Sequence, residues 1–318
     1  MSHLMGRAGH ARVGVLTVIG EEFSALQQAL GANFEVGTST AFSVEKPINE
    51  ISGKRTYPFV LMRCDDRSNL PANTSTKRLI ELFQPEVIIL VGVAGGIRRL
   101  SGESVSGPMP GDVLVSTYVH YAPYSKSEPT GRKQRYFPIA QPAIDLVNHA
   151  NAIESTVEWN WRSGIAISAP DEQYISRVHF GEIISVEAIA GNPDSEEQQD
   201  FIGRFDHADA VDMESSGVGR AIAELGADVH YAPRWVAIRG ISDPVAAIPE
   251  IVSVDNNGTR AIWKDYASSA AGAFARRLAE RLLCDPRDES SADPGVESWA
   301  FEKAMSLVAG TIAGEELR

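Results

Sequence analysis

Short apolar runs that alternate with amphipathic segments constrain the fold of this chain more than any other feature. Residues 12–18 and 87–91 are apolar along almost their whole length, and residues 234–241 form a similar run near the end of the chain. Strands that are apolar on both faces are typical of the centre of a parallel sheet covered by helices on both sides. Helical patterns lie between the runs, among them residues 21–30 and 73–83. The chain is therefore predicted to belong to the α/β class.

A glycine-rich segment follows the run at 87–91 and reads Gly92-Val93-Ala94-Gly95-Gly96. A strand that leads into glycines and a polar loop is how a parallel sheet builds a ligand crevice at its carboxyl edge. Glycine also lets the backbone approach a ligand closely. The spacing fits neither a dinucleotide fingerprint nor a P-loop, and no zinc or nucleophile-elbow motif occurs. We therefore expect a small-molecule site with no metal and no cofactor.

Carboxylates follow several of the predicted strands. Asp212 and Glu214 lie where the strand at 209–212 becomes a helix, and a buried charge needs a partner or a ligand. Glu22 follows the first strand and Asp243 follows the last. Each also has a local explanation, because acids favour the first turn of a helix and Asp-Pro is a common turn. The functional interpretation is that Glu214 holds a ribose.

Composition and charge exclude several classes of protein. The formal net charge of −13 disfavours nucleic acid and anionic membrane as partners, and no apolar run reaches the ~20 residues of a bilayer span. Cys64 and Cys284 match no metal or redox spacing, so we expect free thiols in a reducing cytoplasm. The predicted organisation is a disordered start at 1–11, one domain at 12–284, and a linker with a C-terminal helix at 285–318.

Residues 120–138 are aromatic and locally basic, which is unusual in so acidic a chain. One interpretation is a solvated, flexible loop. The other is a lid whose Arg132, Lys133 and Arg135 meet an anionic part of a substrate. The pattern itself does not choose between these interpretations.

Four blocks of the sequence, taken in order, resemble the purine nucleoside phosphorylase and uridine phosphorylase superfamily. The likeness is greatest to methylthioadenosine/S-adenosylhomocysteine nucleosidases and to nucleosidase-like domains of bacterial signalling and defence proteins. The resemblance implies a three-layer α/β/α sandwich around a twisted mixed sheet, spanning residues 12–284, and a homo-oligomer. The blocks are residues 15–23, 87–97 with 111–117, 210–217, and 236–244.

Carried over by position, the resemblance implies a role for each acid in cleaving an N-glycosidic bond. Glu22 would activate the attacking water, Glu214 would accept hydrogen bonds from the ribose hydroxyls, and Asp243 would donate a proton toward N7 of a purine. Two acids in different environments can divide such roles. The other positions expected to bind the substrate are Gly20, Val93, Ala94, Gly95, Ile189, Met213 and Ser242.

The nature of the nucleophile and the 5′ substituent of the substrate stay open at this point. Phosphorolytic relatives carry Arg and Ser or Thr where Leu90 and Val93 stand here, and a carboxylate at Glu22 repels phosphate, so we prefer hydrolysis. A phosphorylase, or a nucleotide-binding sensor without turnover, remains an alternative. Val93 and Ile189 depart from the thio-nucleoside pattern, and Arg132 and Arg135 would suit a nucleotide such as AMP or ATP.

Overall fold

The computed structural model describes most of the region in which the sequence predicted a domain. The residues it describes are 9–30, 34–36, 42–45, 49–51, 54–101, 104–129, 131–156, 160–188, 195–229, 233–245 and 256–284. The predicted C-terminal segment at 285–318 lies outside this set. The chain divides into one compact unit that ends at Glu280 and a second that begins at Arg281. No helix among the described residues is both long and apolar enough to cross a bilayer.

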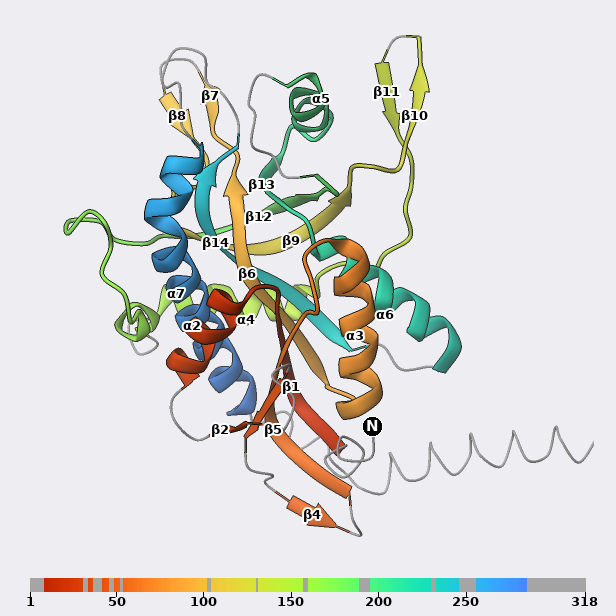
Figure 1. Ribbon diagram of the computed structural model, residues 1–318, viewed down its shortest axis with the longest axis vertical. Helices are drawn as coiled ribbons and strands as arrows, with labels where there is room; N and C mark the ends of the chain where they lie inside the picture. The colour runs from red at the N-terminus through yellow and green to blue at the C-terminus, as the bar shows by residue number, and fades with distance from the viewer. Residues whose placement is uncertain are drawn as a thin grey trace, which may run out of the picture. The chain divides into compact units, whose positions relative to one another are not determined.

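A mixed sheet of ten strands forms the centre of the fold (Figure 1). Its order is β13-β12-β9-β14-β6-β1-β5-β3-β2, with β4 paired to β5. β13 also pairs with β6, so the strands from β6 through β14, β9 and β12 to β13 close into a ring. The strands are β1 (Gly9–Thr17), β2 (Phe34–Val36), β3 (Phe42–Glu45), β4 (Asn49–Ile51), β5 (Lys54–Arg63), β6 (Val87–Gly96), β9 (Val113–Tyr121), β12 (Val178–Ser185), β13 (Ala208–Asp212) and β14 (Arg234–Pro244).

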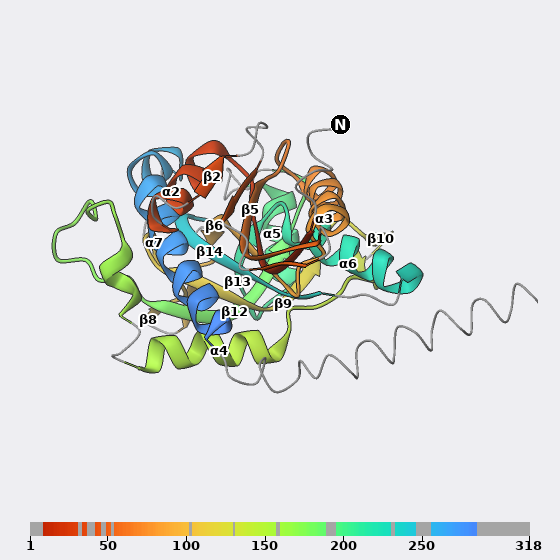
Figure 2. The ribbon, with the colours of Figure 1, turned by 90° about the horizontal axis from the view of Figure 1, so that it is seen from below.

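Helices cover the sheet from both sides. Figures 1 and 2 show α2 and α7 on one side and α3 and α6 on the other. This arrangement confirms the predicted α/β class with a mixed sheet between helical layers. The helices are α2 (Gly20–Leu30), α3 (Asn69–Phe83), α4 (Ile144–Ser155), α5 (Glu196–Arg204), α6 (Ser215–Val229) and α7 (Asn256–Leu283), with a 3₁₀ turn at Trp161–Gly164.

β6 is the central strand, and every residue from Val87 to Gly96 is buried. It runs parallel to β1 on one side and to β14 on the other. The sequence predicted that this strand ends at Val91, but it continues through the glycine segment. The reason is pairing, because the glycine segment bonds β14 from Arg239 to Pro244 and its end also bonds β13.

Other boundaries differ from the sequence predictions. The basic stretch at 120–138 contains a hairpin of β10 (Ser125–Glu128) and β11 (Gly131–Gln134), and a second hairpin joins β7 (Arg99–Ser101) to β8 (Ser104–Ser106). β1 starts at Gly9, inside the segment predicted as a disordered start, because its first residues pair with β5.

Candidate active site

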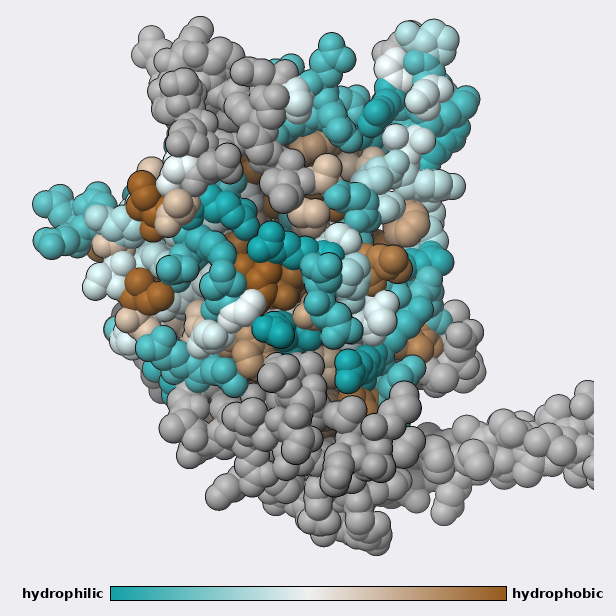
Figure 3. Space-filling view, in the orientation of Figure 1, coloured by the Kyte–Doolittle hydropathy of each residue, from teal (hydrophilic) through white to brown (hydrophobic). Residues whose placement is uncertain are grey.

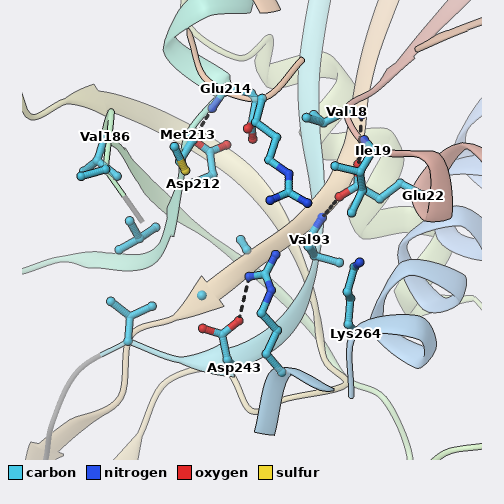
Figure 4. Close-up of a pocket in the computed structure, with 17 residues that line it drawn as sticks. Val18, Ile19, Glu22, Val93, Val186, Asp212, Met213, Glu214, Asp243 and Lys264 are labelled. Carbon is cyan, nitrogen blue, oxygen red and sulfur yellow. Dashed lines mark hydrogen bonds and ion pairs between the residues drawn. The ribbon is translucent and has the colours of Figure 1, made fainter. Parts of the chain in front are cut away.

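A cavity of about 220 Å³ lies where β1, β6, β13 and β14 end (Figure 4). In the space-filling view, apolar surface is visible near the centre of this face and polar residues border it (Figure 3). Acids from distant parts of the chain meet in this cavity. Of the residues that the sequence singled out, Glu22, Val93, Ala94, Gly95, Met213, Glu214 and Asp243 line it.

Glu22 is fixed in the first turn of α2 by backbone donors. Its Oε2 accepts hydrogen bonds from the amides of Val18 and Ile19, each at 3.0 Å, and its Oε1 accepts one from the amide of Val93 at 2.9 Å. The side chain is buried. The carboxylate therefore bridges the exit of β1 to the glycine segment of β6, in one orientation, with an edge toward the cavity.

Asp212 and Glu214 share a buried cation, Arg239 of β14. The Nη2 of Arg239 lies 2.6 Å from Asp212 Oδ2 and 3.3 Å from Glu214 Oε2. Asp212 also accepts from the amides of Glu214 and Ser215, each at 3.3 Å, and so caps the start of α6. Burial lowers the pKa of Arg239, but the two acids outweigh it and raise that pKa overall. Asp212 therefore anchors the turn that presents Glu214 to the cavity.

Glu214 lies in an environment that disfavours its charge. Burial raises its pKa to about 7, and repulsion from Asp212 and Glu22 acts in the same direction, against the attraction of Arg239. The amide of Ser68 donates to its Oε1 at 3.2 Å. A ligand that donates hydrogen bonds to this carboxylate would replace part of the hydration that burial removes.

Asp243 lines the cavity on the β14 side, at the end of that strand. Burial raises the pKa of Asp243, whereas the hydroxyl of Ser242 and the guanidinium of Arg260 act against this rise. Ser242 donates to Asp243 Oδ1, and Arg260 Nη1 lies 3.2 Å from the same oxygen. The other oxygen, Oδ2, takes part in neither contact. An acid whose pKa is raised by burial is better suited to proton donation than the same acid in water.

Two glycines of β6 allow the close packing on which this geometry depends. A Cβ on Gly92 would overlap Arg239 Nη1 and would lie 2.9 Å from Glu22 Oε1. A Cβ on Gly95 would overlap Val245 Cγ2. Arg239 Nη1 is buried and has no hydrogen-bond partner in the part of the chain that the structure describes. Gly92 therefore leaves the space in which a cation and the Glu22 carboxylate face one another.

Several predicted site residues do not line this cavity. Gly20 starts α2 and borders a separate, open hollow, and Ser242 is buried behind Asp243. Ile189 lies outside the described residues. Arg132 and Arg135 belong to the β10–β11 hairpin and its exit, and both are exposed away from the cavity. The sheet topology explains this result, because the hairpin extends beyond the end of β9 (Figure 1).

Sequence reasoning missed the cations of the cavity wall, which are Arg67, Arg260 and Lys264. The spacing of Arg260 and Lys264 places both on one face of a helix and could have drawn attention to them. Arg67 lies in a polar loop before α3 and gives no comparable signal. Arg239, which joins two of the acids, looked like an ordinary strand residue.

The arrangement suits acid–base chemistry at a bond between two parts of a ligand. Asp243, whose pKa is raised, lies at the β14 side, and Glu22 and Glu214, the latter also with a raised pKa, lie across the cavity from it (Figure 4). Within the described ranges, no group of three or more His, Cys, Asp or Glu side chains is placed to hold a metal ion.

Residues 12–282 match the phosphorylase superfamily. A 5′-methylthioadenosine/S-adenosylhomocysteine nucleosidase of Exiguobacterium sp. is 27% identical over 173 residues, which are 54% of this chain and 62% of that protein. The chain thus spans less than two thirds of the length of that relative. The corresponding nucleosidase of Staphylococcus epidermidis is 23% identical over 231 residues, covering 73% of this chain and 86% of that protein.

Solved structures share the fold. A futalosine hydrolase of Helicobacter pylori superposes with a TM-score of 0.59 at 17% identity, covering 85% of this chain and 97% of that one. A Neisseria meningitidis nucleosidase in complex with methylthio-immucillin-A gives a TM-score of 0.57 at 19% identity, covering 84% and 97%. Since the family match extends from the first strand almost to the end of α7, this chain belongs to the phosphorylase superfamily.

Proposed function

We propose that the cavity hydrolyses the N-glycosidic bond of a purine nucleoside or nucleotide and releases the free base. The observation that carries this proposal is the convergence of Glu22, Glu214 and Asp243 on one cavity. The nucleosidases among the relatives support hydrolysis of this bond class. A solved relative from Colwellia psychrerythraea holds adenine, which supports an adenine-type base.

Asp243 acts as the general acid. When the bond between C1′ and the base nitrogen breaks, the electron pair leaves with the base, and a proton at N7 neutralises it. The burial that raises the pKa of Asp243 favours its protonated form. Ser242 and Arg260 both contact Oδ1, so Oδ2 is the oxygen that carries the proton. General acid assistance of this kind typically contributes ~10²–10⁴-fold to the rate.

Glu214 and Glu22 act at the sugar. Glu214 accepts hydrogen bonds from the ribose hydroxyls, with Met213 packed beneath the ring. Glu22 accepts a proton from the attacking water while its other contacts, all backbone amides, hold it in place. Negative charge on these two groups also stabilises the positive charge that develops on the sugar in the transition state.

The environment of Glu22 favours water over phosphate as the nucleophile. The amide of Val93 donates to Glu22 and is therefore not available to bind a phosphate oxygen at the glycine segment. A buried carboxylate at this place also repels an anion. Phosphorolysis is the second candidate, and binding without turnover is the third. The homo-oligomer and the cytoplasmic location remain predictions.

Chromatographic detection of free base tests the proposal. The protein is incubated with adenosine, methylthioadenosine and AMP, each with and without inorganic phosphate. We expect phosphate-independent release of adenine from at least one of them. Release that requires phosphate and yields ribose 1-phosphate would establish the phosphorylase instead. Tight binding without any base released would favour the sensor.

Variants assign the roles. Glu22→Gln, Glu214→Gln and Asp243→Asn are each expected to reduce base release by ~10²-fold or more. Glu182→Gln serves as the matched control, because its side chain pairs with His120 at 2.8 Å and does not line the cavity. Full activity in any of the site variants would remove that residue from the mechanism.

A further inference from the structure

Three cationic side chains line the cavity, Arg67, Arg260 and Lys264, in a chain whose formal net charge is −13. The proposed chemistry gives no role to two of the three, Arg67 and Lys264. Arg260 contacts the catalytic Asp243, but Arg67 and Lys264 contact none of the three proposed catalytic acids in the described structure. Because the cavity also carries acids, only the part near Arg67 and Lys264 favours a negatively charged group of the ligand.

Arg67 and Lys264 both line the cavity, and the charges of both act on Glu21 in the first turn of α2. Lys264 Nζ lies 2.7 Å from Glu21 Oε1, and the Glu21 side chain is 55% exposed. The hydrogen bond from Lys264, together with the nearby charges of Lys264 and Arg67, lowers the pKa of Glu21. Figure 4 shows Lys264 on the same side of the cavity as Glu22, with Glu214 on the other. Both cations are therefore close to the place proposed for the sugar.

The present partner of Lys264 is easily replaced. An exposed ion pair such as Lys264–Glu21 contributes little to stability because water screens it. A phosphoryl group offers several charged oxygens at once, and an arginine can bind two of them with its fork of donors. Arg260, one helical turn before Lys264 on α7, adds positive potential to the same wall.

A phosphoryl group tethered to the substrate fits this geometry better than free phosphate. Free phosphate used as a nucleophile would have to reach the sugar carbon beside Glu22, where the carboxylate repels it. Lys264 pairs instead with the exposed Glu21, and the charge of Arg67 also acts on Glu21. An anion held there can belong to a substituent of the sugar.

We propose that Lys264 and Arg67 bind the 5′-phosphoryl group of the substrate, so that the protein acts on nucleoside 5′-phosphates in preference to nucleosides. This inference rests on the proposed function. The bond from C1′ to the base breaks, and the base takes the electron pair and the proton of Asp243. Water oxygen bonds to C1′ and gives a proton to Glu22. The products from a monophosphate are free base and ribose 5-phosphate.

The test compares kcat/KM for adenosine and AMP in the wild type, Lys264→Ala and Arg67→Ala. Loss of one charge-assisted contact is expected to lower kcat/KM for AMP by roughly 10- to 100-fold, mainly through KM, with adenosine almost unchanged. Lys126→Ala is the matched control, because it also removes a lysine from an ion pair, at 3.0 Å from Glu128, on the β10–β11 hairpin. Lys126→Ala should leave kcat/KM unchanged for both adenosine and AMP.

Each other outcome is informative. Equal kcat/KM for adenosine and AMP, with equal losses in Lys264→Ala, would overturn the inference and leave N-glycosidic hydrolysis standing. Stimulation of adenosine cleavage by inorganic phosphate, with ribose 1-phosphate as product, would assign the cations to a co-substrate and overturn it as well. If neither compound releases base, the proposed function fails, and calorimetry then tests the inference alone. AMP binding at least tenfold tighter than adenosine, lost in Lys264→Ala, supports it; equal affinities refute it.

Discussion

Glu214→Gln should make the free protein more stable at neutral and alkaline pH while it removes activity. The substitution keeps the size of the side chain and removes one of the buried negative charges around Arg239. Asp212 still pairs with Arg239, whose Nε and Nη2 both donate to Asp212 Oδ2. The charge on Glu214 thus lowers the stability of the free protein, and the same charge is proposed to accept hydrogen bonds from the substrate.

The magnitude follows from the pKa of Glu214, which burial raises from its ordinary 4.5 to about 7. Between these two values the unfolded chain has lost the proton that the folded protein still holds, so stability falls as pH rises through this window. The resulting loss of stability in the wild type amounts to about 3 kcal/mol at pH 8 and about 1 kcal/mol at pH 5. The glutamine variant avoids this loss at both pH values.

The assay is urea denaturation of the wild type and Glu214→Gln at pH 5 and pH 8. The variant should gain about 2 kcal/mol more over the wild type at pH 8 than at pH 5. Comparing the two pH values cancels the pH-independent effects of the substitution. Glu224→Gln is the control for the direction of the effect. Lys77 and Arg220 lower the pKa of Glu224, so removing this carboxylate should not stabilise the protein as pH rises. A Glu214→Gln variant less stable than the wild type by the same amount at both pH values would refute the reasoning.

Three further outcomes are expected. Gly92→Ala should reduce the steady-state rate by about 100-fold, because the added methyl group displaces Arg239 and Glu22 beside it. Gly203→Ala is the control and should retain the wild-type rate, because a Cβ there would have no neighbour within 4 Å. Arg239→Met should lower the free energy of unfolding by roughly 3–5 kcal/mol, measured in urea, since it leaves buried acids unpaired. The pH profile of kcat/KM should fall on the acid side as Glu214 gains a proton near pH 7; a flat profile through this range would contradict the role of Glu214.

The sequence predicted much of the fold because the signals involved are local. The apolar run at 87–91 and the strand at 209–212 each lie in a buried strand of the structure. The acids that follow strands could be found for the same reason, since a parallel sheet brings strand exits to one edge. Boundaries were less accurate. β6 extends through its glycines because β14 and β13 bond to it, and a local pattern carries no information about those partners.

The lid hypothesis for residues 120–138 rests on local composition, which does not specify where the segment lies in the fold. Basic residues in an acidic chain drew attention to Arg132 and Arg135, yet the hairpin extends from the sheet and leaves them exposed away from the cavity. The cations that do line the wall, Arg67 and Lys264, come from segments far apart in the chain. Their convergence depends on how α7 packs beside α2, which no local pattern specifies.

The sequence by itself determined the class of fold and the acids available for chemistry, because periodicity and strand exits are properties of neighbouring residues. Only the tertiary structure decided which charges meet. It placed Arg239 between Asp212 and Glu214, fixed Glu22 on amides from the exit of β1 and from β6, and brought Lys264 to the wall of the same cavity. The physical reason is that burial and charge pairing depend on distance in space, so the pKa of an acid such as Glu214 is set by residues that its own segment does not contain.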